Sequence, residues 1–183
     1  SYTLPTRTFE DALTIVVGDK RVELLNVGPA HTGGDVIAHI PEDKTVFTGD
    51  ILFNESHPII WAGPVTNWIK ACDLMLGWDL ETVIPGHGPI AEKSAIRNMR
   101  DYFVYLDTEA RKRFDAGMEV EEAALDIAMD SYDHWLDGER ITINVQSLYR
   151  EYGAPPMKWD RISLHGMMAR YRKHKKSACD HHH

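Results

Sequence analysis

The chain has 183 residues, which is enough for one domain with a sizeable core, or for such a domain with helices attached to it. Its composition is that of an ordinary soluble globular protein, with 43% hydrophobic and 26% charged residues, and no apolar run approaches the roughly 20 residues that span a bilayer. The formal net charge of −8 argues against the basic surface of a nucleic-acid-binding protein. We therefore expect a globular protein that binds neither nucleic acid nor membrane.

The two cysteines and the two ends of the chain indicate its compartment and its limits. Cys72 and Cys179 lie far apart in the sequence, so no disulfide framework is expected and the reducing cytoplasm is the expected location. The chain begins at Ser1 rather than at Met, and the three final histidines (residues 181–183) look like the remnant of a purification tag. We expect residues 177–183 to form a disordered tail or tag remnant without a role in a site.

The N-terminal part of the chain, residues 1–90, is rich in β-branched residues and turns, which predicts a sheet. The predicted strands cover residues 13–17, 21–27, 35–40, 45–50 and a short buried stretch at 82–84. The sequence Gly18-Asp19-Lys20 separates the first two strands and suits a β-hairpin. Apolar residues recur at helical spacing over 65–78, which predicts a helix between the last two strands.

After residue 90 the pattern is entirely helical. The predicted helices cover residues 91–117, 119–130, 142–153 and 161–176, and Gly117 and Gly153 provide two of their C-terminal stops. We interpret residues 91–176 as a helical extension of the same α/β (α+β) domain that residues 1–90 begin.

Three residues stand out by their positions at the ends of predicted strands. His31 follows the strand 21–27, Asp50 ends the strand 45–50, and His87 follows the strand 82–84. Loops at strand ends are where α/β proteins assemble their sites, and imidazole nitrogen with carboxylate oxygen suits a hydrolytic zinc or a similar ion. The alternative is that each is an ordinary loop residue, a hydrogen-bonded histidine or a turn-capping aspartate.

The motifs around these residues resemble a known family. "HTGGD", "VFTGD" and "PGHG", in this order and spacing, resemble the second half of the metallo-β-lactamase-fold hydrolases, which include glyoxalase II-like thioesterases, lactonases and polyketide cyclases. The resemblance covers about residues 13–90. It implies that His31 binds a first metal, that Asp50 bridges two metals, and that His87 binds the second. It also implies hydrolysis of an ester, thioester, lactone or amide by a hydroxide between two divalent ions, with zinc expected.

One departure from the family pattern limits what this chain can do. The family signature His-x-His-x-Asp-His is absent, and no histidine precedes His31. The family fold is a four-layer αββα sandwich of two similar halves, so we expect this chain to form the second half followed by a C-terminal helical extension. The first half would precede Ser1 in a longer protein, which the missing initiator Met favours, or belong to another chain. Otherwise the chain is a natural fragment without metal chemistry.

An incomplete site and an uncovered sheet face have consequences for activity and assembly. We expect the chain alone to be inactive or nearly so, because a catalytic metal needs at least three ligands and two metals need more. The uncovered face of a half sandwich is a large apolar patch, which predicts a partner chain, a homo-oligomer or aggregation. A non-catalytic interaction module and a polyketide-cyclase-like member of the fold are the alternative functions.

The segment 51–68 follows Asp50 directly and is expected to run over the mouth of the site. His57 and Trp61 are the residues predicted to touch a small-molecule substrate, although His57 could be an ordinary loop residue and Trp61 a pocket wall or lid. Trp68 lies on the apolar face of the predicted helix, which indicates a core residue. Asp35 could orient a ligand histidine or cap the start of its strand.

Overall fold

The structure is a computed structural model that describes residues 3–155 and 161–180, and its central element is one five-stranded sheet. The strands are β1 (Ala12–Val17), β2 (Lys20–Asn26), β3 (Val36–Ile40), β4 (Thr45–Phe53) and β5 (Thr82–His87). They lie side by side in chain order. The first three neighbouring pairs are antiparallel, whereas β5 runs parallel to β4. A parallel pair needs a crossover, which helix α1 (Val65–Leu76) supplies.

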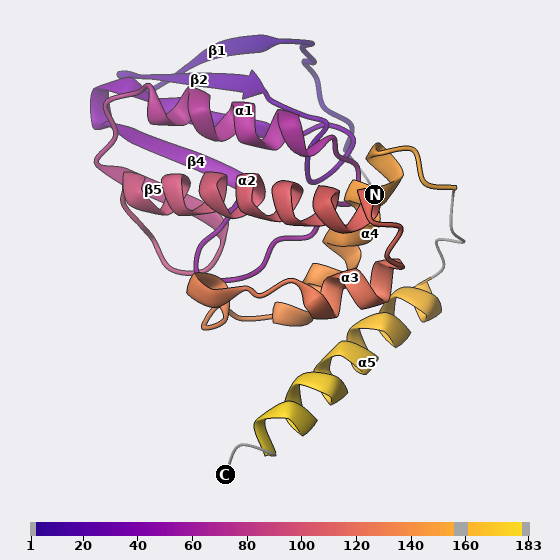
Figure 1. Ribbon diagram of the computed structural model, residues 1–183. Coiled ribbons are helices and arrows are strands. Elements are labelled where there is room, and N and C mark those ends of the chain that lie inside the picture. Colours follow the sequence, from indigo (N-terminus) through magenta and orange to yellow (C-terminus); the bar gives the residue numbers. More distant parts are fainter. Residues whose placement is uncertain (1–2, 156–160, 181–183) are drawn as a thin grey trace.

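The remaining helices follow the sheet in the sequence and lie to one side of it (Figure 1). They are α2 (Lys93–Asp115), α3 (Val120–Asp126), α4 (Ile141–Glu151) and α5 (Arg161–Asp180). Short 3₁₀ turns occur at Pro41–Asp43, Asp130–Tyr132 and Gly138–Arg140. Helices α1 and α2 lie side by side in front of the sheet, α4 packs on α2 and α3, and α5 points away toward the C-terminus (Figure 1).

The two faces of the sheet differ in what covers them. Paired residues on neighbouring strands form rows across the sheet, and side chains in successive rows point to opposite faces. One row runs Thr14, Glu23, His39, Val46 and Val83 across all five strands, and its last three members are buried on the helix side. The next row runs Leu13, Leu24, Ala38, Phe47 and Ile84 on the opposite side. Phe47 in the second row keeps 43% of its surface exposed. The expected half sandwich, one sheet with helices on a single face, is therefore confirmed.

The core lies between the sheet and the helices. Trp68 of α1 is fully buried there, as its position on the apolar helix face predicted, and its indole Nε1–H donates to the carbonyl of Ile51 at 2.7 Å. Met75, Ile96 and Phe103 fill the same layer from α1 and α2. Helix α4 is buried along almost its whole length, so this helix is part of the core and not a surface addition.

The sequence located the elements well, and the differences are local. Strand β4 continues to Phe53, so Asp50 lies inside the strand and does not end it, and His87 is the last residue of β5. Helix α5 extends to Asp180, so residues 177–180 are helical where a tail was expected, and the tag-like residues 181–183 lie outside the described part. No helix within residues 3–155 and 161–180 combines the length and the apolar character needed to cross a membrane.

Candidate metal centre

The structure brings His31, Asp50 and His87 together around the Asp50 carboxylate. One oxygen, Oδ2, lies 3.3 Å from His31 Nε2, and the other, Oδ1, lies 3.5 Å from His87 Nε2. The side chain of His31 is nearly buried, whereas the Asp50 and His87 side chains are 37% and 52% exposed. The cluster is thus open to solvent on the His87 side and closed behind His31.

Glycines allow the Asp50 side chain to approach its neighbours. The pairing of β4 with β5 shifts register between Phe47 and Gly49, and Gly49 takes a positive φ of 51°. A Cβ on Gly86 would lie 2.1 Å from Asp50 Oδ1 and 2.7 Å from the Gly49 backbone. Only glycine fits at position 86 beside this carboxylate, which gives the "PGHG" sequence a direct structural reason.

The loop that carries His31 is held by Asp35. The Asp35 carboxylate accepts hydrogen bonds from the backbone N–H groups of Ala30 and Thr32, each at 3.0 Å to Oδ2, and from the Thr32 hydroxyl at 2.7 Å. A Cβ on Gly28 would lie 2.4 Å from the Asp35 backbone nitrogen. Asp35 therefore fixes the backbone on both sides of His31, where the sequence left a choice between orienting the ring and capping the strand.

The contacts of the His31 ring define its protonation pattern. Its Nδ1 lies 2.7 Å from the carbonyl oxygen of Ile59, and because a carbonyl only accepts, Nδ1 carries the proton. In the neutral ring Nε2 then presents a lone pair to Asp50 Oδ2, which is also an acceptor. Two facing acceptors are stable when a cation lies between them, and two ligands of one tetrahedral zinc lie roughly 3.3 Å apart. His31 Nε2 and Asp50 Oδ2 therefore fit two ligand positions of a divalent ion.

The three side chains form two pairs that share Asp50. His87 stacks on Phe53, with ring centroids 4.3 Å apart and planes 13° from parallel, and so faces the opposite carboxylate oxygen from His31. Within the described residues, no group of three or more His, Cys, Asp or Glu side chains is arranged to hold a metal ion by itself. Each imidazole–carboxylate pair offers two donors, which is fewer than the three protein ligands of a catalytic zinc.

A cavity of about 400 Å³ lies next to His87. Its walls include Ser56, His134 and Arg140, and the Arg140 guanidinium lies 5.7 Å from the ring centre of Phe53. Arg140 Nη2 pairs with Asp137 at 3.0 Å, so this cation is already neutralised locally. Sequence reasoning missed Arg140, because it comes from a turn between helices that carries no recognisable motif.

His57 lies in a different environment from the one predicted for it. The ring is 1% exposed, with Nε2 3.1 Å from the Tyr132 carbonyl oxygen and Nδ1 3.2 Å from the Tyr102 hydroxyl. Burial lowers the pKa of His57 to about 4, so the ring is neutral at pH 7. Both nitrogens are engaged within the protein, which leaves neither free for a substrate beside Asp50.

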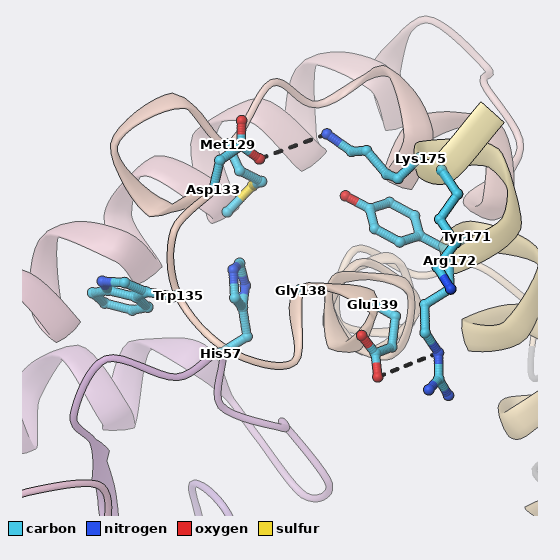
Figure 2. A pocket seen from close by; sticks show the side chains of 10 residues that line it. His57, Met129, Asp133, Trp135, Gly138, Glu139, Tyr171, Arg172 and Lys175 are labelled. Carbon is cyan, nitrogen blue, oxygen red and sulfur yellow. Dashed lines mark ion pairs between the residues drawn. The ribbon is translucent and has the colours of Figure 1, made fainter. Parts of the chain in front are cut away.

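His57 also lines a second cavity, of about 280 Å³. Figure 2 shows the His57 ring pointing toward Met129 and Asp133, with helix α5 at the side. Tyr171 of α5 lines the far side of the cavity. Residues that line this cavity form two ion pairs, Lys175–Asp133 at 3.6 Å and Arg172–Glu139 at 3.5 Å. The ion pairs join α5 to the segment that precedes α4.

Trp61 lies at a third cavity, of about 430 Å³, with an apolar lining. The side chain of Trp61 is 42% exposed, and Ile59, Ile143, Leu164 and Met168 supply most of the other walls. Ile59 therefore lines this cavity with its side chain while its carbonyl oxygen accepts from His31.

Comparison with known proteins identifies relatives of part or most of the chain. The sequence model of the family described as "Metallo-beta-lactamase superfamily" matches residues 1–87. The α subunit of 2,4-dinitroanisole O-demethylase from Nocardioides sp. (strain JS1661) is 24% identical over 171 residues, which cover 86% of this chain and 44% of that protein. The acyl-coenzyme A thioesterase MBLAC2 from Gallus gallus is 27% identical over 89 residues, which cover 45% of this chain and 31% of that protein. The chain spans less than half the length of these curated relatives.

A solved structure shares the fold. The inverting sec-alkylsulfatase Pisa1 from Pseudomonas sp. aligns with a TM-score of 0.62 at 14% identity, covering 82% of this chain and 28% of that chain. Because 82% of the chain is more than residues 1–87, the alignment includes part of the helical region that follows them. The sequence match and the mixed α/β fold support the resemblance: residues 1–87 of this chain match the metallo-β-lactamase superfamily, a family of metal-dependent hydrolases.

Proposed function

We propose that this chain supplies one half of a two-metal hydrolytic site, in which Asp50 is shared between His31 and His87. The observation that carries the proposal is the Asp50 carboxylate, which faces His31 Nε2 with one oxygen and His87 Nε2 with the other. Such a carboxylate suits a bridge between two ions better than a ligand of a single ion. The substrate would be an ester, thioester, lactone or amide, a range that includes the substrate class in the name of the thioesterase relative.

Some residues of this chain would bind the metal ions, and others keep those ligands in position. Divalent ions bound there, with zinc expected, would supply an activated water and would polarise the carbonyl under attack. His31 and His87 hold their nitrogens toward Asp50, and the glycine at position 86 keeps the carboxylate in reach. The apolar cavity beside Trp61 would hold the apolar part of the substrate, because its lining offers dispersion contacts and few polar partners.

The remaining metal ligands would come from a partner that covers the open sheet face. The row through Leu24 and Phe47 presents apolar side chains that helices α1 and α2 do not cover. The partner would be a preceding half of the same protein or a second chain. The same open row supports the alternative function of a non-catalytic interaction module, in which the partner is bound without chemistry.

Zinc binding by the purified chain tests the proposal. Residues 181–183 are first changed to Ala, because their imidazoles would themselves bind zinc. Calorimetric titration is expected to show weak zinc binding that Asp50→Asn reduces at least about tenfold. Asp79→Asn is the matched control, since Asp79 is an exposed aspartate that pairs with Lys44 at 3.1 Å and lies outside the candidate site.

Two outcomes would contradict the proposal in different ways. Equal zinc affinity in the parent chain and in Asp50→Asn would show that Asp50 does not bind zinc. Rapid metal-dependent hydrolysis of an activated ester by the chain alone would show that its site is already complete, and that no partner supplies ligands.

A further inference from the structure

We propose that Asn144 of helix α4 is a positioning residue for His31, because its amide holds the peptide group that contains the Ile59 carbonyl and the peptide group before it. This inference rests on the proposed function, in which His31 is a metal ligand whose position affects metal binding. Asn144 lies outside the residues 1–87 that match the family, so the superfamily match does not assign it a role.

The contacts of Asn144 resemble those of a neighbouring β-strand. Its Nδ2 donates to the Pro58 carbonyl oxygen at 2.9 Å, and its Oδ1 accepts from the Ile60 N–H at 2.9 Å. One planar amide thus binds the peptide groups before and after Ile59. The Ile60 N–H belongs to the same planar peptide group as the Ile59 carbonyl, so holding it together with the preceding peptide group leaves this carbonyl little freedom to rotate.

The orientation of the Ile59 carbonyl has a direct effect on His31. The carbonyl oxygen lies 2.7 Å from His31 Nδ1 and keeps the proton on that nitrogen. His31 Nε2 is then left with its lone pair toward Asp50. A metal-binding histidine needs this arrangement, in which one nitrogen donates to a carbonyl and the other is free to bind.

A second layer of buried hydrogen bonds holds Asn144 in place. Its Nδ2 also lies 3.1 Å from the Tyr102 hydroxyl, which lies 3.2 Å from His57 Nδ1. His57 Nε2 carries a proton, because its partner at 3.1 Å is the Tyr132 carbonyl. The donor directions then agree along the whole line: Asn144 donates to Tyr102, Tyr102 to His57, and His57 to the carbonyl. Asn144, Tyr102 and His57 are each at most 1% exposed.

The state of the His31 ring can be measured directly, without metal and without activity. Long-range proton–nitrogen NMR of the full chain, labelled with ¹⁵N-histidine, distinguishes a ring protonated on Nδ1 from one protonated on Nε2. The His31 signals are assigned by their loss in His31→Gln. We expect the parent chain to hold the Nδ1–H form, and Asn144→Ala to shift the ratio toward Nε2–H by roughly fivefold, the effect of one typical hydrogen bond.

Ser147→Ala is the matched control. Ser147 is fully buried on the same helix and donates to the Ile60 carbonyl oxygen at 2.6 Å, which lies in the following peptide group, so it bonds neither of the two peptide groups that Asn144 holds. This variant should lose stability and leave the His31 ratio unchanged. An equal shift in both variants, or no shift in a folded Asn144→Ala, would overturn the inference.

Tyr102→Phe keeps the test decisive if Asn144→Ala does not fold. Losing the hydroxyl frees one Asn144 hydrogen and should shift the His31 ratio in the same direction, by about twofold. An unchanged ratio in Tyr102→Phe together with an unfolded Asn144→Ala counts against the inference. Zinc added to the parent chain tests the proposed function separately: if the Asn144 effect is present but zinc moves neither the His31 nor the His87 signals, the positioning holds and the metal site does not.

Discussion

Two buried histidines in this molecule lie in opposite situations. His57 has an acceptor opposite its protonated nitrogen and a donor opposite the other, so the site is complete as it stands. His31 has an acceptor opposite each nitrogen, the Ile59 carbonyl on one side and the Asp50 carboxylate on the other. The difference teaches that hydrogen-bond direction, and not burial alone, separates a structural histidine from one prepared for a cation.

The largest effect is expected from closing the space beside Asp50. Gly86→Ala places a methyl group 2.1 Å from Asp50 Oδ1 and against the Gly49 backbone, so the strands must separate locally. We expect a loss of about 2–4 kcal/mol in the free energy of unfolding, measured by urea denaturation. Gly33→Ala is the control, because nothing lies within 4 Å of its added Cβ. A change below about 0.5 kcal/mol in Gly86→Ala would contradict the tight approach.

His57 should make the stability of the protein depend on pH. Its pKa is lowered from 6.5 to about 4 by burial, so below pH 6.5 the unfolded chain binds the proton more readily than the folded one. This contribution is fully present above pH 6.5 and is lost as the pH falls toward 4, about 2–3 kcal/mol between pH 7 and pH 4.5. His57→Gln should be less stable at pH 7 and should show a smaller loss over that interval. Equal losses in both proteins would exclude His57 as the cause.

The smallest change in stability is expected for Asp50→Asn. Whether the variant is more or less stable than the parent chain is the informative result. Asp50→Asn replaces an acceptor by an amide that can donate to His31 Nε2, so without metal the variant should gain about 0.5–1 kcal/mol. Thermal unfolding in a chelating buffer measures this gain, and added zinc should reverse the order of the two proteins. A clear loss of stability in the chelating buffer would mean that His31 is protonated and already paired with the carboxylate.

Much of the fold followed from local pattern, because strands and helices are set by near neighbours. Gly18 marked the hairpin and the apolar spacing around Trp68 marked a core helix, and both predictions are confirmed. The surroundings of His57 did not follow, since its partners Tyr102 and Tyr132 are 45 and 75 residues away. Asn144 carried no sequence signal at all, because a single amide in a helix looks the same whether it faces solvent or a peptide group.

The sequence named three residues that the structure brings together, but it did not give their arrangement, and their role as metal ligands stays a prediction. The motif order pointed to His31, Asp50 and His87, and the structure places all three at one carboxylate. That each carboxylate oxygen faces a different imidazole depends on the stacking of His87 on Phe53 and on the turn around Gly86, which only the packed strands reveal. The ligands needed to complete the site stay a prediction.

Strand β4 carries a further consequence, because its side chains alternate between the two faces. Val46 and Thr48 point into the core, and uninterrupted alternation would send Asp50 to the same side, where an unpaired carboxylate would be costly. The extra residue at Gly49 changes the parity of the strand, so Asp50 leaves the core at the point where a charge is needed. After Asp50 the strand does not return to simple alternation, since Ile51, Leu52 and Phe53 are all buried and the pairing with β5 shifts a second time before Phe53. A deletion of Gly49 would therefore turn the Asp50 side chain toward the core and away from the two histidines.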